Sequence, residues 1–262
     1  MGRSRVAQAA GDAVATGRRG IVPVALGVTV SALMLSGCES TQERSAELRG
    51  QAKHDVLAAQ SASVHKESAS VEVVQSTVVH SSGGSAVVVA LRNTSTHTLE
   101  NAPIEITVRD AHGGVLFQNN QPGLEPSLTR ISLLPPGAQT TWVDDQVETT
   151  GVPASASALV GEGVQASGSI PQLNLTGAHL SAETGNEATL SGTVTNRSQT
   201  AQQNLVVYAV ARRGSKIVAA GRAVLPEVPA GTNSATNVPF QIYFVGDPSG
   251  AQIQTSAPAT TF

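Results

Sequence analysis

Cysteine, aromatic side chains and charge are all scarce in this chain. It has one cysteine among 262 residues, 3% aromatic residues and 13% charged residues. A single cysteine cannot form an intramolecular disulfide, and it excludes CxxC motifs, cysteine-rich zinc sites and cysteine-held clusters. The charged fraction is about half of the ~25% that is usual, and the formal net charge is −3. Such a chain is not expected to bind nucleic acid, which is recognised through many phosphate contacts.

Catalytic motifs are missing as well. The chain contains neither GxSxG nor HExxH, so we predict no enzymatic activity and no cofactor. Because serines are plentiful, a Ser-His-Asp geometry stays open, and an exported hydrolase is kept as an alternative. The letters GEGVQA at 161–166 match GxGxxA, but dinucleotide binding needs a helix directly afterwards. Residues 167–171, SGSIP, cannot begin a helix, so we interpret this stretch as a linker.

The lone cysteine follows an uncharged hydrophobic run. Residues 21–35, IVPVALGVTVSALML, number fifteen and come directly after a basic stretch with Arg18 and Arg19. The run is shorter than the ~20 residues of a membrane-spanning helix. It fits the apolar region of a secretory signal peptide behind a basic region. A free cysteine in an ordinary transmembrane segment is the alternative interpretation.

The sequence LSGC, which ends at Cys38, resembles the lipobox of bacterial lipoproteins. In that family a diacylglyceryl group is attached to the cysteine thiol, and signal peptidase cuts just before it. The resemblance implies cleavage between Gly37 and Cys38, removal of residues 1–37 as a signal peptide, and a lipid such as palmitate on Cys38. Two or more acyl chains anchor a protein stably. We therefore expect the chain on the extracytoplasmic face of a bacterial cell membrane.

The amino-acid composition of the sequence changes at Val71. Residues 38–70 are polar and lack aromatic side chains, so we predict a lipidated N-terminus followed by a flexible or partly helical stalk. From Val71 on, short runs rich in Val, Ile and Thr alternate with Gly, Asn, Ser and Pro. In residues 104–108, IEITV, apolar and polar side chains alternate with the period of a half-buried strand. Further strands are predicted at 71–74, 86–91 and 114–117.

The β-rich part contains an internal repeat. The segment AVVVALRNTS, 86–95, parallels TLSGTVTNRS, 189–198, which sets Asn93 and Asn196 103 positions apart. An Asn just beyond a strand can bond its own backbone and begin a turn. Further pairs follow in the same order, namely 104–108 with 205–209, the glycine hairpins at 113, 114 and 214, and the corners 133–137 and 227–231.

The two corners are only 94 positions apart, so we expect extra residues in the first copy, at 118–129. Glycine in the hairpins would supply a positive φ. We predict an all-β chain with two tandem immunoglobulin-like β-sandwiches, at 71–165 and 166–262.

The repeat resembles the FxLyD-type domain, a small immunoglobulin-like sandwich of secreted bacterial and archaeal proteins. The first copy matches through LRNTS at 91–95 and VRDAHG at 108–113. The second matches through VTNRS at 194–198 but lacks the hairpin aspartate. The resemblance implies a sandwich fold and no particular activity, because such modules host many roles.

Clusters of charged residues are the remaining candidates for functional sites. Asp144, Asp145 and Glu148 are weak candidates for a Ca²⁺ site, without EF-hand spacing, and a solvated loop or strand edge is the alternative. The first copy is acidic, with nine acidic and three basic residues at 71–165. In the second copy four basic residues bracket one hairpin, namely Arg212, Arg213, Lys216 and Arg222. They could face the membrane, an anionic envelope polymer or the acidic first copy, or simply be solvated.

These observations lead to one functional prediction. We expect a membrane-anchored extracytoplasmic lipoprotein that acts as a non-enzymatic binding or interaction module of the cell envelope. Its partners would be the membrane, through the lipid on Cys38, and an envelope protein or polymer. A carrier of a metal or small ligand is the alternative.

Overall fold

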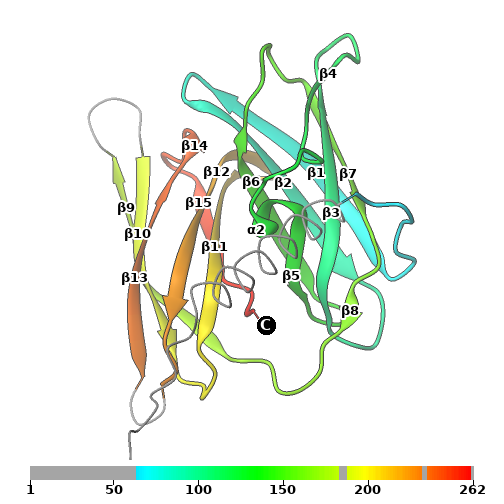
Figure 1. The fold of residues 1–262 in the computed structure, drawn as a ribbon. Helices are drawn as coiled ribbons and strands as arrows, with labels where there is room; N and C mark the ends of the chain where they lie inside the picture. Colours follow the sequence, from blue (N-terminus) through cyan, green and yellow to red (C-terminus); the bar gives the residue numbers. More distant parts are fainter. Residues whose placement is uncertain (1–62, 183–187, 232–234, 261–262) are drawn as a thin grey trace, which may run out of the picture. The chain divides into compact units, whose positions relative to one another are not determined.

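The computed structural model describes residues 63–182, 188–231 and 235–260. These residues all lie in one compact unit of the chain. As the sequence predicts, they form an all-β fold, and the named strands pair antiparallel (Figure 1). No helix of this described part is long and apolar enough to cross a membrane. The predicted signal peptide, Gly37 and Cys38 lie outside the described residues.

The first copy of the repeat contributes two sheets. One is the β2 sheet, with strand order β1-β2-β6. Its strands are β1 (Val71–Ser81), β2 (Gly84–Asn93) and β6 (Gln139–Val147). The other is the β3 sheet, in which β3 (Leu99–Arg109) pairs with every other strand. Those strands are β4 (Val115–Gln118), β5 (Arg130–Leu134), β7 (Ser155–Val160) and β8 (Val164–Gln165). The short helix α2 (Pro126–Thr129) precedes β5.

The second copy also contributes two sheets. The β10 sheet has the order β13-β10-β9, from β9 (Leu173–Ala182), β10 (Ala188–Asn196) and β13 (Thr236–Tyr243). The β11 sheet has the order β14-β12-β11-β15. Its strands are β11 (Gln202–Arg213), β12 (Lys216–Val228), β14 (Val245–Gly246) and β15 (Gln252–Ser256).

The β11 sheet is buried on both faces. Along β11, alternate side chains enter different hydrophobic cores. One core holds Val206, Tyr208 and Val210 together with the β2 and β3 sheets. The other holds Leu205, Val207 and Ala209 together with the β10 sheet. The β2 sheet is enclosed in the same way, and every residue of 86–91 is at most 1% exposed. Uninterrupted apolar runs are typical of strands covered on both faces.

The two copies therefore share a core. Strand β12 contacts both β2 and β6, and β14 contacts β1. The β2 sheet thus lies between the β3 sheet and the β11 sheet. The division of the chain at residues 165 and 166 remains a prediction.

The extra residues predicted at 118–129 interrupt a strand. In the second copy β12 runs without a break, and its Val228 pairs with Gln202 at the far end of β11. In the first copy the corresponding stretch is split into β4, a loop with α2, and β5, which returns so that Leu134 pairs with Leu99. Asn119 holds this insertion, because its Nδ2 donates to the carbonyl oxygens of Ile104 at 3.1 Å and Leu128 at 2.7 Å.

The predicted asparagine turns are confirmed in both copies. Asn93 and Asn196 are each 0% exposed. Asn93 Oδ1 accepts from the backbone N–H and the hydroxyl of Ser95 at 2.9 and 2.8 Å, and Asn196 Oδ1 accepts from Ser198 at the same two distances. Each Nδ2 donates to the carbonyl four residues on and to a carbonyl at the proline corner, Leu134 or Pro229.

Two details of the predicted repeat need correction. Asn101 and Asn204 have φ of 56° and 49°, and they lie 103 positions apart, like the turn asparagines. This spacing aligns Ile104 with Val207, two residues beyond the predicted partner. Gly113 and Gly214 have positive φ as expected, but Gly114 does not. At Gly114 a Cβ would lie 2.8 Å from Asp110 Oδ2, so any larger residue requires that carboxylate to shift.

The last residues of the predicted stalk are held against the body. The backbone N–H of Ser68 donates to the carbonyl of Val160 at 2.8 Å, and Glu67 forms an isolated bridge with Gly161. Lys66 pairs with Glu162 at 2.7 Å in an exposed salt bridge. Residues 66–68, which the sequence assigned to the stalk, therefore belong to the body.

Candidate functional site

A buried arginine joins the two copies of the repeat. The side chain of Arg222, on β12, is 2% exposed. Its Nε donates to Asp145 Oδ1 at 3.1 Å, and its backbone N–H donates to Asp145 Oδ2 at 2.9 Å. Its two terminal nitrogens donate to Ser127 Oγ at 2.8 Å and to Glu125 Oε2 at 3.0 Å. A buried charge needs such complete pairing to be tolerated.

The insertion of the first copy supplies two of these partners. Glu125 and Ser127 lie at the beginning of α2. Trp142 of β6 is 1% exposed, and its Nε1 donates to the carbonyl of Ser127 at 3.1 Å. The indole therefore positions the insertion against Arg222. We name Arg222, Asp145, Glu125 and Ser127 the junction network.

Asp144 lies next to this network and is almost unpaired. The residue is 1% exposed, its Oδ1 accepts from the backbone N–H of Gln146 at 2.9 Å, and its Oδ2 is buried without a partner. Burial raises the pKa of Asp144 to about 6, against smaller opposing effects of the Gln146 N–H and of Arg222. Burial likewise raises the pKa of Tyr208, whose side chain lies in the hydrophobic core that the β11 sheet shares with the β2 and β3 sheets.

Asp144 is expected to make the fold less stable as the pH rises from about 4 to about 6. In this window the folded state retains a proton on Asp144 that the unfolded state has released, so the free energy of unfolding falls with pH. The cost above pH 6 amounts to about 3 kcal/mol at most. Asp144→Asn should flatten this part of the stability profile and raise the stability at pH 7 to 8. Urea unfolding between pH 4 and 8 measures both effects.

Glu148→Gln is the matched control for that experiment. Glu148 follows the same strand, and the change removes the same charge from an exposed side chain. Its profile should follow that of the unchanged chain. A profile for Asp144→Asn that still falls between pH 4 and 6 would contradict the assignment to Asp144.

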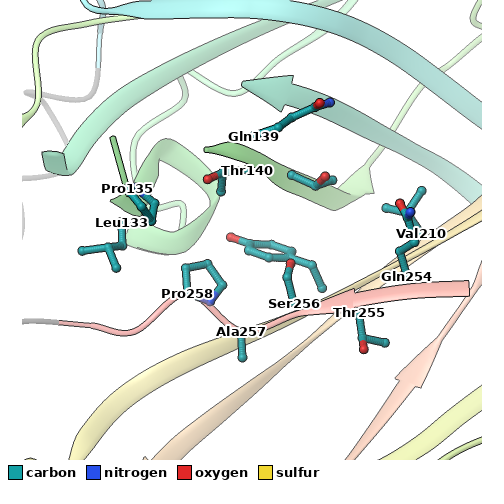
Figure 2. A pocket seen from close by; sticks show the side chains of 12 residues that line it. Leu133, Pro135, Gln139, Thr140, Val210, Gln254, Thr255, Ser256, Ala257 and Pro258 are labelled. Atoms are coloured by element: carbon teal, nitrogen blue, oxygen red, sulfur yellow. The ribbon is translucent and has the colours of Figure 1, made fainter. Parts of the chain in front are cut away.

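A groove of about 360 Å³ is lined in part by Tyr208, which pairs with Arg222 across β11 and β12. Figure 2 shows the side chains that line it, with Leu133, Pro135 and Pro258 at one end and Val210 and Gln254 at the other. None of the lining residues is charged. They are Leu133, Pro135, Gln139, Thr140, Thr141, Tyr208, Val210, Gln254, Thr255, Ser256, Ala257 and Pro258. The groove therefore takes side chains from both copies of the repeat.

A second cavity, of about 380 Å³, is lined by residues of α2 and of strands β3, β5, β11 and β12. Glu125 and Ser127 of the junction network line it, together with Asn101 and Asn204. The two asparagines with positive φ, equivalent in the repeat, thus border a single cavity.

The predicted acidic cluster does not converge on one point. Asp145 is engaged by Arg222, Asp144 is buried in the core, and Glu148 is exposed. Among the described residues no group of three or more His, Cys, Asp or Glu side chains is placed to hold a metal ion. The geometry therefore gives the metal-carrier alternative no site at these residues.

The predicted basic cluster is also divided. Arg222 faces the acidic first copy, which is one of the expected possibilities. Arg213 is about half exposed and pairs with Asp247 at 2.8 Å within the second copy. Arg212 is half-buried and Lys216 is exposed. The four cations therefore do not form one surface for an anionic polymer.

Sequence inspection missed the roles of Trp142, Tyr208 and Glu125. One signal was available for Arg222, because a lone arginine in the apolar run IVAAGRAVL of β12 indicates a buried, paired charge. Its partners lie 77 to 97 positions away along the chain, so no local pattern could name them.

Comparison with known proteins assigns no family. No protein-family model matches the chain, and a search of curated proteins gives no significant match.

Proposed function

We propose that this chain is a lipoprotein, anchored on the extracytoplasmic face of the cell membrane, whose β-rich body acts as a non-enzymatic binding module. The LSGC sequence supports the anchor on Cys38. The groove between the two copies supports the binding role. The groove is the main support for a binding role, because its lining offers hydroxyl, amide and apolar groups in a volume suited to a ligand.

The groove favours binding over catalysis. Its lining contains hydroxyl groups but no histidine, carboxylate or cation that could activate them or stabilise charge in a transition state. The junction network and the shared core hold the two walls of the groove in a fixed relation. Preorganised walls reduce the entropy cost of binding.

We also propose that the body consists of two FxLyD-like, immunoglobulin-like β-sandwiches in tandem, at 71–165 and 166–262. The matched hydrogen bonds of Asn93 and Asn196 support this, as do the matched left-handed Asn101 and Asn204. In this proposal the modules are fused face to face, through the β2 and β11 sheets.

Cys38→Ala should abolish the incorporation of labelled palmitate and leave the precursor uncut. The thiol is the only atom of this chain that could carry a thioether-linked lipid, because no second cysteine exists. Radiolabelling and intact mass measurement of the membrane fraction check both effects. Ser36→Ala keeps a small residue beside the cleavage site and serves as the control, which should be labelled and cut. A Cys38→Ala chain that is still labelled and processed would refute the anchor.

The binding role can be tested in cells with a photo-crosslinking residue. Gln139 is exposed and lines the groove, whereas Gln241 is exposed on β13 in the β10 sheet. We expect benzoylphenylalanine at 139 to form a discrete adduct with an envelope component, and the same residue at 241 to form none. The absence of adducts from 139, with the chain correctly anchored, would refute a ligand at this groove.

A further inference from the structure

Two strand edges border the groove. Among the described strands, β6 has a neighbour on one side only in the order β1-β2-β6, and the same is true of β15 in the order β14-β12-β11-β15. Both sheets contribute to the groove through these edges, by residues 139–141 of β6 and 254–256 of β15. An edge strand presents main-chain N–H and C=O groups that can pair with another chain.

The lining residues of β15 lie on both faces of the strand. Ser256 pairs with Tyr208, and Gln254 pairs with Val210, so these side chains share one face of the sheet. Thr255 pairs with Ala209 and points to the opposite face, yet it also borders the groove. Figure 2 shows Thr255 and Ala257 directed away from Ser256. Because the side chains of consecutive strand residues point to opposite faces, this unbroken run indicates that main chain of β15 borders the groove.

We propose that the groove binds an extended, uncharged peptide segment of a partner protein, which adds as a strand to the free edge of β15. This inference rests on the proposed binding function and specifies its ligand. Thr140 and Thr141 of β6 form the opposite wall of the groove, and Tyr208 and Val210 of β11, the neighbour of β15 in its sheet, also line it. Strand addition gives affinity through main-chain hydrogen bonds and specificity through alternate side chains.

The lining determines the chemistry of that segment. A charged side chain would lose water on entering the groove and would find no opposite charge there. Threonine, serine and glutamine can pair with small polar side chains, and Leu133, Pro135 and Pro258 can contact an apolar one. At about 3.3 Å per residue, the five border residues 254–258 span room for about five residues of an added strand.

A peptide fits these edges better than a neutral glycan does. The hydrogen-bonding groups of a strand edge repeat at the spacing of another peptide chain, whereas a glycan would have to be read by side chains alone. A neutral glycan as the ligand is therefore an outcome that would overturn the proposal.

The experiment uses the full, lipidated chain in detergent micelles and affinity selection read by mass spectrometry. The probe is a pool of acetylated, amidated hexapeptides of Val, Thr, Ser, Gln and Ala. A second pool carries an N-methyl group on every residue, which keeps the side chains and removes all of the N–H donors needed for strand pairing. We expect members of the first pool to be retained, and the second pool to be retained at least about tenfold less.

Two variants of β15 form a matched pair. Gln254 and Gln252 are two residues apart on one face of the strand, and only Gln254 lines the groove. Gln254→Glu should lower retention about tenfold, because it places a carboxylate in the uncharged groove. Gln252→Glu should leave retention unchanged. Equal retention of the methylated pool, equal effects of the two variants, or no retained peptide would each overturn the proposal.

The two experiments distinguish a failure of the peptide proposal from a failure of the proposed binding function. If benzoylphenylalanine at 139 captures a glycan while no peptide is retained, the groove binds a ligand and the peptide inference is overturned. If neither experiment gives a signal, the proposed function fails as well.

Discussion

Arg222→Ala is expected to lower the free energy of unfolding by about 3–5 kcal/mol, the usual cost of removing one partner from a buried ion pair. The change leaves the Asp145 carboxylate, whose side chain is 17% exposed, without its guanidinium partner. It also removes the donors to Ser127 and Glu125, and so releases the insertion from β12. Guanidinium chloride unfolding followed by tryptophan fluorescence measures the loss, because Trp142 is the one tryptophan and contacts the insertion.

Arg213→Ala is the matched control. Arg213 lies on the strand paired with β12 and also forms an ion pair, but its side chain is 46% exposed. Exposed pairs contribute at most about 1 kcal/mol, so this variant should unfold close to the unchanged chain. Equal losses from the two variants would contradict a special role for the junction network. An Arg222→Met, Asp145→Leu double variant should recover much of the stability, since apolar residues can replace a buried pair.

Asn93→Ala and Asn196→Ala should each lower the free energy of unfolding by about 2–4 kcal/mol. Each asparagine makes four hydrogen bonds from a fully buried position. Alanine would leave buried backbone groups at the turn and at the proline corner without partners, and these losses are the costly ones. Thermal or denaturant unfolding of both variants measures the effect.

The two asparagine substitutions should lower the free energy of unfolding equally. Because the two networks match bond for bond, the two substitutions should agree to within about 1 kcal/mol. Asn174→Ala, on the exposed surface of β9, is the control and should stay within about 0.5 kcal/mol of the unchanged chain. A large loss from one turn and none from the other would show that the turns do not play equivalent structural roles.

The local elements were predictable from the sequence because their causes are local. The alternation in 104–108 predicts the half-buried β3, and its apolar residues are buried as expected. An asparagine or glycine beyond a strand determines a turn through its own backbone contacts, so Asn93, Asn196, Gly113 and Gly214 could be interpreted without knowledge of the rest of the chain. The unequal spacing of the corners also located the insertion.

Some predictions from the sequence were wrong because one local sequence pattern was compatible with two alignments, two conformations or two sets of contacts. The alternation of β11 is compatible with an alignment to β3 shifted by two residues, and only the φ of Asn101 and Asn204 decides between the alignments. A side chain at position 114 would meet the carboxylate of Asp110, a contact that no turn rule specifies. Asp144 and Asp145 are neighbours in the sequence, but one enters the core and the other meets Arg222.

The sequence alone therefore predicted the β class, several of the strands, the turns at Asn93, Asn196, Gly113 and Gly214, the repeat and the place of the inserted residues, and it supplied the LSGC motif on which the anchor rests. Only the tertiary structure decided that the β2 and β11 sheets pack on one another, that Arg222 closes their junction and that two strand edges border one groove. The physical reason is that periodicity reports whether a face is buried, while the identity of the covering sheet depends on contacts between residues far apart in the chain.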